Sequence, residues 1–380
     1  MKIVNVECDY LLVDVPIPVR ETTTEYGVLL VTLEADNGLK GYGFAREHEL
    51  HALAVRQLIV NDLTMFLKRF PDIPTPEFVW HEAAFDLPRS DYRIASGITA
   101  RAASAVDQAL WDLRGKALQE PVWRLLGGAQ PEVEIYATFG LNIYNPEEET
   151  EAARRLKEQG FTSFKLQGSD ADRGRDLSVD SGRVRRLRET VGDDARVILD
   201  GRNIYSLFQA IELTKMLEPY NMAFFDEPLY AKDPLGMRQL REACPGVPLA
   251  ARGRGGNIWD NRDLMTSGVL GVMGVSVMDQ GGITQSIKIA HAAEMFHLPV
   301  ATGGGWHLQN AHLIAGVTNG WMTEYHALAA GVGDALFVDP VQPKSGKIKL
   351  SEKPGMGIEL DRDAVKDARK RAEVAVAQKR

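Results

Sequence analysis

The second half of the chain repeats one pattern of apolar and polar positions. Seven times between Lys165 and Glu324, a short apolar run ends in a polar or charged residue and gives way to a helical pattern. The runs are continuous, as in strands that are covered on both faces. With an earlier run at 133–139, this pattern predicts the eight strands of a (β/α)8-type barrel. The other strands are expected at 161–166, 197–200, 223–226, 248–251, 275–279, 299–302 and 322–325.

The first third of the chain has a different pattern. The β-type runs at 2–13 and 28–34, followed by the turn Asp36-Asn37-Gly38, predict a three-stranded antiparallel meander. A long polar loop is expected over 16–26. The pattern then becomes helical, and apolar residues at helical spacing predict a helix over 103–118.

These patterns divide the chain into three parts. We expect an α+β domain over 1–128, a barrel over 129–350, and a C-terminal segment over 351–380 that packs back on the first domain. A chain of 380 residues exceeds one ordinary domain, and a large barrel with a smaller domain accounts for the length.

Composition and charge narrow the class of protein. With 44 basic and 52 acidic residues the net charge is -8, which argues against nucleic acid or an anionic membrane as the main partner. A local basic pocket for a small acid remains compatible with this charge. Cys8 and Cys244 lie far apart in the sequence, which favours two buried, reduced thiols over a disulfide or a zinc site. Glu7 and Asp9 interrupt the region where a signal peptide would need an apolar core, so we expect a cytoplasmic protein.

Charged residues end several predicted barrel strands, where barrel enzymes build their active sites. Lys165 and Gln167 point the same way from the second strand. Lys165 could belong to an outer ion pair, but the carboxylates at neighbouring strand ends favour a functional lysine. Asp200 and Asp226 are suited to hold a hard cation through oxygen ligands. Asp200 could instead cap a helix or form a structural salt bridge.

Later strand ends add candidates for proton transfer and anion binding. His307 follows the turn Gly303-Gly304-Gly305-Trp306, which would let the chain enter the barrel mouth, so we predict proton transfer there. A lone histidine is more often structural. Glu324 closes the ring of charges. Gly281-Gly282 could bind an anionic group at a helix start, although a glycine pair is weak evidence.

The chain resembles the enolase superfamily, in particular its mandelate racemase and muconate lactonizing enzyme branch. The resemblance covers essentially the whole chain. It is most specific in AVDQALWDLRGKALQEPVWRLLGG at 105–128, in FFDEPL, in GGIT at 281–284, and in the WHLQNAHL and EYH runs. It implies an α+β capping domain whose loop reaches over the mouth of a modified (β/α)8-type barrel, written (β/α)7β. It also implies abstraction of a proton next to a carboxylate, an enediolate stabilised by Mg2+, and a homo-oligomer.

The resemblance assigns roles to the residues at the strand ends. Lys165 matches the first lysine of the family's Lys-x-Lys motif on the second strand. Gln167 stands where the second lysine, usually the base, would be, and a glutamine cannot abstract a proton. Asp200 and Asp226 match the first two metal ligands, the second of which is Glu in most relatives.

The third metal ligand departs from the family pattern. An acidic residue should follow PLAA, but this chain reads Arg252-Gly253-Arg254, and Arg202 adds a further cation at the same mouth. Two carboxylates and several arginines do not make the usual three-carboxylate magnesium site.

Other carried-over positions concern proton transfer and substrate binding. His307 matches the histidine base of the seventh strand. Its usual partner is an Asp about five residues ahead of the Gly-Gly pair, whereas Asp279 lies only two ahead of Gly281. Glu324 matches the acid of the eighth strand. Thr23 to Tyr26 fall where the capping loop contacts substrate.

The first hypothesis is therefore a lyase that dehydrates a sugar acid or a related hydroxy acid. His307 would act as acid or base, Lys165 would contact the carboxylate or enediolate, and Glu324 would assist by hydrogen bonding. Gln167 argues against racemisation, because inversion needs a base on each face of the substrate.

Three alternatives stay open. Arg254 or Arg252, with Arg202, could occupy the place of the metal, since a guanidinium pairs with carboxylates and with an acid substrate. The barrel could instead bind a small carboxylic acid without turnover. A Schiff-base aldolase that uses Lys165 is a further possibility in a barrel.

Overall fold

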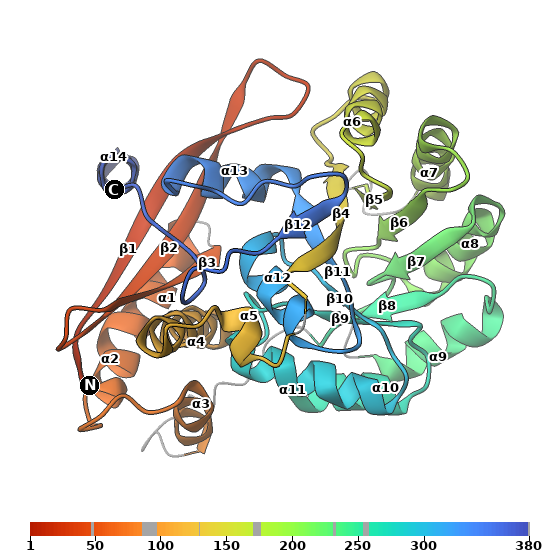
Figure 1. Cartoon of the computed structure of the whole chain (residues 1–380). Helices are drawn as coiled ribbons and strands as arrows, with labels where there is room; N and C mark the ends of the chain where they lie inside the picture. Colours follow the sequence, from red (N-terminus) through yellow and green to blue (C-terminus); the bar gives the residue numbers. More distant parts are fainter. Residues whose placement is uncertain are drawn as a thin grey trace.

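The computed structural model describes residues 1–46, 49–85, 97–128, 130–169, 176–230, 233–253 and 258–378. Eight parallel strands follow one another around a barrel, which closes because the last strand pairs with the first (Figure 1). They are β4 (Glu132–Gly140), β5 (Ser163–Gln167), β6 (Arg196–Asp200), β7 (Met222–Asp226), β8 (Leu249–Ala251), β9 (Val272–Val275), β10 (Val300–Thr302) and β11 (Gly320–His326).

A helix follows each barrel strand, and the predicted barrel is confirmed. The helices are α6 (Pro146–Glu158), α7 (Leu177–Val191), α8 (Leu207–Leu217), α9 (Pro234–Ala243), α10 (Ile258–Thr266), α11 (Gly282–Met295), α12 (His307–Gly316) and α13 (Ala327–Leu336). A short 3-10 helix η3 (Glu218–Tyr220) follows α8, and β12 (Lys347–Lys349) adds to β4 antiparallel.

The barrel interior is a packed apolar layer with a polar layer above it. Strands other than β5 contribute one residue each to the apolar layer: Tyr136, Ile198, Phe224, Ala250, Val272, Ala301 and Met322. Side chains two residues apart on a strand share a face. The residues two positions further along therefore form the next layer, and they include Thr138, Asp200, Asp226, Arg252 and Glu324. The strand register thus gathers the charges at one end of the barrel.

The sixth barrel strand ends earlier than its apolar run predicts. We expected a strand over 275–279, but β9 ends at Val275. The backbone N–H of Ser276 donates to Oε1 of Gln280 at 2.6 Å, and the N–H of Gln280 donates to the carbonyl of Ser276. These bonds close a turn, so Asp279 lies beyond the strand.

The first domain contains the predicted antiparallel meander, made of β1 (Ile3–Pro16), β2 (Thr23–Ala35) and β3 (Lys40–Arg46). The long helix α4 (Gly97–Leu118) packs against this sheet. A Cβ at Gly41 would lie 2.1 Å from the carbonyl oxygen of Ala109, and one at Gly43 would lie 1.9 Å from that of Ala105. The two glycines therefore permit the close approach of helix and sheet.

The first loop of the meander is shorter than predicted. The β1–β2 ladder continues to the pair Pro16 and Thr23, so only residues 17–22 form the loop, in place of 16–26. The threonine-rich segment has a high β propensity, which favours its addition to the strand. The tip of the hairpin reaches the start of α6, where Arg20 pairs with Glu148 at 2.7 Å.

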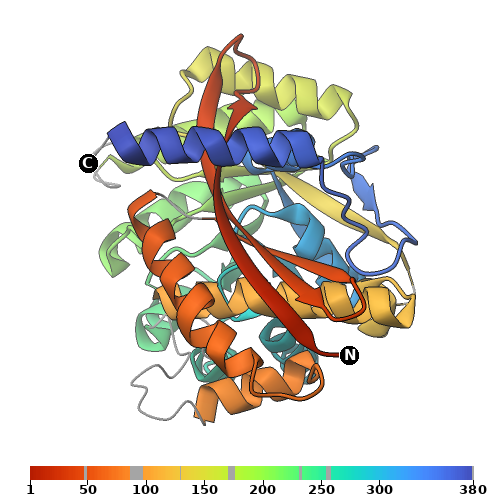
Figure 2. The same ribbon diagram turned by 90° about the vertical axis from the view of Figure 1, so that its left-hand side faces the viewer.

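The remaining helices lie on the first domain and beside the barrel. They are α1 (Glu49–Gln57), the π-helix η1 (Leu58–Leu63), α2 (Thr64–Leu67), α3 (Pro76–Phe85), α5 (Val122–Leu125) and the C-terminal α14 (Arg362–Gln378). Figure 2 shows α14 lying across the β1–β2 hairpin. Arg371 of α14 pairs with Asp14 of β1 at 2.6 Å.

Two smaller expectations concern cysteines and membranes. Cys8 and Cys244 are both free and buried, which confirms the prediction of buried thiols. Within the described residues, no helix has both the length and the apolar character needed to cross a membrane.

Candidate active site

A cavity of about 510 Å³ opens at the carboxyl ends of the barrel strands. We call this cavity the mouth. Its lining includes residues from the barrel and from the first domain: Arg46, Arg101, Gln167, Asp200, Arg202, Arg252, Asp279, Glu324 and His326. The mouth therefore brings together six residues that the sequence singled out from different barrel strands or loops, namely Gln167, Asp200, Arg202, Arg252, Asp279 and Glu324.

Lys165 lies directly beneath the mouth, between two carboxylates. Its Nζ is 2.5 Å from Oδ2 of Asp226, 2.9 Å from Oδ2 of Asp200 and 3.9 Å from Oε1 of Glu324. Its side chain is 1% exposed. The predicted lysine and both predicted metal ligands thus form one buried ion cluster.

The charges in this cluster shift one another's pKa values. Burial alone would lower the pKa of Lys165, but Asp200 and Asp226 raise it well above its ordinary value. Burial raises the pKa of Asp226 to about 6 in spite of the lysine. Burial would also raise the pKa of Asp200, but Lys165 and Arg252 together lower it below its ordinary value. Lys165 is therefore a fixed positive charge at neutral pH and no free base.

Arg252 crosses the bottom of the mouth as a second buried cation. Its Nε lies 3.2 Å from Oε1 of Glu227, and its side chain is 7% exposed. Burial would lower its pKa, but Glu227 and Asp226 raise it. A Cβ at Gly303, just after β10, would lie 2.3 Å from Nη1 of Arg252. A glycine at this position is what leaves room for the guanidinium.

Glu324 is held by donors on both of its oxygens. Thr138 donates to Oε1 at 2.6 Å, and the backbone N–H of Gly305 donates to Oε2 at 2.7 Å. Burial would raise the pKa of Glu324, but nearby positive charges, Lys165 first among them, lower it below its ordinary value. Glu324 is thus a fixed carboxylate in the wall of the mouth.

Asp279 and His307 do not form a pair. Oδ1 of Asp279 lies 3.6 Å from Nε of Arg101, and its Oδ2 accepts from Oγ of Ser276 at 3.3 Å. His307 instead begins α12 and lines a small separate cavity with Tyr325 and Val341. Burial lowers the pKa of His307 to about 4. The predicted role of His307 in proton transfer has no support from this position, because its side chain does not line the mouth.

The predicted capping-loop residues also lie outside the mouth. Thr23 is an exposed residue that begins β2. Tyr26 is buried in β2, where the guanidinium of Arg46 stacks over its ring at 4.9 Å. Tyr26 therefore supports Arg46, which does line the mouth. Arg254, another predicted substrate contact, lies outside the described residues.

The Gly281-Gly282 turn binds a carboxylate from the protein itself. Asp107 of α4 accepts the backbone N–H of Thr284 at 3.0 Å, and Ser104 accepts that of Gly281 at 2.8 Å. A Cβ at Gly282 would lie 2.3 Å from Oδ2 of Asp107. The suggested anion site at this helix start is therefore filled, and it joins the first domain to the barrel.

Three ionisable residues of the mouth were not predicted from the sequence. Arg46 ends β3 and Arg101 lies in α4, and both reach the mouth only because the first domain docks over the barrel. No local sequence signal indicates that docking. His326 could have been found, since it follows Glu324 by two residues and shares its face of β11.

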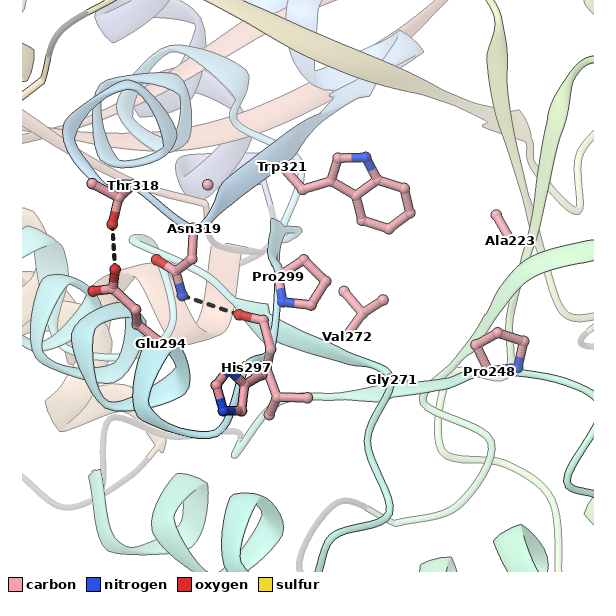
Figure 3. A pocket seen from close by; sticks show the side chains of 12 residues that line it. Ala223, Pro248, Gly271, Val272, Glu294, His297, Pro299, Thr318, Asn319 and Trp321 are labelled. Atoms are coloured by element: carbon pink, nitrogen blue, oxygen red, sulfur yellow. Dashed lines mark hydrogen bonds between the residues drawn. The ribbon is translucent and has the colours of Figure 1, made fainter.

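A second cavity lies at the opposite end of the barrel, where strands begin. It has a volume of about 670 Å³. Figure 3 shows its lining, with Trp321, Pro299, Val272 and Pro248 around the opening. Polar residues of this lining bond to one another: the hydroxyl of Thr318 donates to Glu294 at 2.7 Å. It contains none of the predicted site residues.

Two protein-family models match this chain, one in its N-terminal domain and one in its barrel. Residues 7–127 match the mandelate racemase/muconate lactonizing enzyme N-terminal domain. Residues 147–364 match the enolase C-terminal domain-like family. The first match lies in the N-terminal domain, and the second begins after β4 and extends through the barrel to the start of α14.

Several relatives are similar over most of their length. Arabinonate dehydratase from Saccharolobus solfataricus is 27% identical over 343 residues, which cover 89% of each chain. D-galactonate dehydratase from Klebsiella pneumoniae is 30% identical over 376 residues, covering 90% of this chain and 91% of that enzyme.

Solved structures agree with this assignment. A racemase from Streptomyces coelicolor A3(2), solved with bound magnesium, superposes with a TM-score of 0.84 at 26% identity, covering 96% of this chain and 99% of that one. The barrel, the capping domain and both family matches lead to one conclusion. The chain belongs to the mandelate racemase/muconate lactonizing enzyme branch of the enolase superfamily.

Proposed function

We propose that the protein abstracts the proton next to the carboxylate of a small hydroxy acid and eliminates water, as a sugar-acid dehydratase does. The observation that carries this proposal is the pair of buried cations, Lys165 and Arg252, at the bottom of a mouth that is also lined by carboxylates. Two similar enzymes named above are dehydratases of sugar acids, which supports this reaction.

The cations suit the charge that develops during proton abstraction. An α-proton of a carboxylate is weakly acidic, so the enediolate needs electrostatic stabilisation in a site with little water. Arg252 and Arg202 line the mouth and would attract the substrate carboxylate. Lys165 lies one layer below and adds a positive charge that does not depend on pH near neutrality.

We assign the transferred proton to Asp279. Its contacts with Arg101 and Ser276 are long, at 3.6 and 3.3 Å, whereas both oxygens of Glu324 accept short hydrogen bonds. The C–H bond next to the carboxylate would break with its proton moving to Asp279. The C–O bond on the adjacent carbon would then break, and the hydroxyl would leave as water with that proton.

Magnesium is the cofactor that the magnesium-bound neighbours suggest, but the donor set here fits it poorly. A hard divalent cation takes several oxygen ligands. The oxygens of Asp200 and Asp226 that converge are already bridged by the ammonium of Lys165, and Arg252 adds a second positive charge. The proton transfer described above is therefore assigned to residues of the chain alone.

A second candidate function is binding of a small acid without turnover. Gln167 lines the mouth where relatives place a lysine base, and Lys165 is held in an ion cluster below it. A barrel with these two features would retain a cationic pocket and lack a strong base.

The expected homo-oligomer stays a prediction, which light scattering would test.

One experiment separates the two functions. The purified full chain is incubated with a panel of aldonic and aldaric acids, and 2-keto-3-deoxy products are detected as semicarbazones. We expect turnover of at least one acid and loss of turnover in Asp279→Asn. The matched control is Asp14→Asn in β1 of the capping domain, outside the mouth, which should keep turnover. Binding of an acid with no product, and no exchange of its α-proton in D2O, would contradict the dehydratase and favour the binder.

The same assay tests the metal. We expect turnover to persist after dialysis against a chelator and to be unchanged by added Mg2+. Activity that appears only with Mg2+, together with one bound ion per chain by metal analysis, would overturn the assignment of the cationic role to Lys165 and Arg252.

A further inference from the structure

His326 is the histidine that lines the mouth among the described residues. It ends β11, two residues after Glu324, and its side chain is buried on the same face of that strand. It also lies close to the capping domain, since a Cβ at Gly305 would be 3.8 Å from Cβ of His326 and 3.9 Å from Nη1 of Arg46.

One ring nitrogen of His326 is committed to the backbone. His326 is the N-cap of α13, and its Nδ1 accepts the backbone N–H groups of Leu328 at 3.3 Å and Ala329 at 3.4 Å. An N-cap acceptor needs a lone pair, so Nδ1 carries no proton in this arrangement. In a neutral imidazole the single proton then lies on Nε2.

The surroundings favour this neutral form. A positive charge on the ring would face the N–H groups at the start of α13, where the helix dipole is positive. Burial is the main cause that lowers the pKa of His326 to about 4, Arg46 and Lys165 lower it further, and Glu324 and Asp200 oppose this. Within the described residues Nε2 has no hydrogen-bond acceptor, and the ring borders the mouth.

We propose that His326 is a neutral hydrogen-bond donor that binds a carboxylate or enediolate oxygen of the substrate through Nε2–H. Its role is that of a fixed dipole aimed at developing negative charge, and not that of a base. The helix start holds the tautomer, because rotating the ring would leave two backbone N–H groups without their acceptor. This inference rests on the proposed function for its substrate class, but its tautomer can be tested separately.

Two substitutions separate the two nitrogens. In His326→Asn the side-chain oxygen can replace Nδ1 as the helix cap, while the donor at the position of Nε2 is lost. In His326→Gln the longer amide can place a donor near Nε2, while the cap is lost. We expect His326→Asn to keep its unfolding midpoint, to lose about 100-fold in kcat and to raise KM by a smaller factor. His326→Gln should retain more of kcat and unfold more easily.

The tautomer is read directly by nuclear magnetic resonance. With 15N-histidine in the full chain, the signal that disappears in His326→Asn identifies this ring. We expect a protonated Nε2 and an unprotonated Nδ1 that do not titrate between pH 5.5 and 8 (roughly the range in which an ordinary histidine titrates). A proton on Nδ1, titration near the ordinary pKa, or wild-type kcat in His326→Asn would each overturn the proposal.

Galactonate and arabinonate serve as probes if no turnover is found. Binding of either acid should shift the Nε2–H resonance of His326, and a bound acid that leaves it unchanged would overturn the role of His326 alone. If neither acid nor any other member of the panel binds, the proposed function fails together with this inference.

Discussion

The two ends of the barrel both carry a cavity, yet only one has the chemistry of an active site. The cavity where the strands begin is the larger, at about 670 Å³ against about 510 Å³ for the mouth. Among the described residues, the lining of the larger one has two prolines, two glycines and Trp321 but no arginine (Figure 3), whereas four arginines and three carboxylates line the mouth. Volume therefore does not identify the site in this protein, and the charged groups that converge there do.

The difference has a physical origin in the strand register. The apolar layer through the middle of the barrel separates the two ends. Towards the carboxyl ends, the next inward position on several strands is charged, and buried cations and carboxylates contact one another there. Towards the amino ends, the lining comes from short loops and the first residues of strands, which mainly pack. Substitutions at the two ends should therefore differ in their effects on turnover.

The largest effect should come from Lys165→Met. It leaves Asp200 and Asp226 buried without their cation, and removing one partner of a buried ion pair costs about 3–5 kcal/mol. Turnover should fall below detection. Trp321→Phe at the opposite end should keep turnover. Denaturant unfolding and the product assay measure both properties. A Lys165→Met protein that is as stable as the wild type would contradict the ion cluster.

The next effect is the response to acid. Because the folded pKa of His326 is lowered from 6.5 to about 4, its stabilising contribution is present above pH 6.5 and is lost as the pH falls towards 4. The loss amounts to about 3 kcal/mol by pH 4, at about 1.4 kcal/mol per pKa unit. His326→Asn should therefore lose less stability between pH 7 and 4 than the wild type does. Trp321→Phe should follow the wild-type curve. Parallel curves for all three proteins would refute the buried neutral histidine.

A glycine substitution tests the space for Arg252. In Gly303→Ala the new Cβ would lie 2.3 Å from Nη1 of Arg252, so the guanidinium must move. We expect a loss of about 1–3 kcal/mol and a marked fall in turnover. Gly271→Ala at the opposite end, where the new Cβ would be 3.1 Å from Cβ of Pro248, should leave turnover unchanged. Equal losses of turnover in the two variants would show that the effect is general and does not act through Arg252.

The smallest effect should be a gain in stability at the other end. His297 follows α11 with a φ of 57°, a conformation that glycine adopts more easily. His297→Gly should raise the unfolding free energy by about 0.5–1 kcal/mol and leave turnover as it was. Differential scanning calorimetry would detect the gain. A fall in turnover in this variant would mean that the larger cavity contributes to function.

Much of the barrel could be predicted from the sequence because parallel strands impose a simple register. Lys165, Asp200, Asp226 and Glu324 each end an apolar run, and side-chain alternation turns all four towards the same end of the barrel. Strand order follows chain order, so these side chains meet. Their convergence needed no knowledge of loops.

The parts that could not be predicted depend on turns and on domain docking. The ordinary β-type run up to Asp279 gave no sign that Gln280 would close a turn after Val275. His307 follows two residues of the mouth, Gly304 and Gly305, in the sequence. It begins α12, however, and its ring lies beside Val341 in a separate cavity. The role of Gly303 becomes visible only with Arg252 beside it, and Arg46 arrives from a separate domain.

The helix α14 has a consequence for how the chain is made. Val365, Ala368 and Ala372 are buried, and Arg369 and Arg371 pair with Asp9 and Asp14 of β1. The sheet formed by β1 and β2 is thus completed by a helix that is synthesised roughly 300 residues later (Figure 2). At about 5–20 residues per second, roughly 300 residues separate the two by some 15–60 s. During that interval the hairpin exposes an apolar face, and a chaperone that shields it would be expected to increase the yield of folded protein.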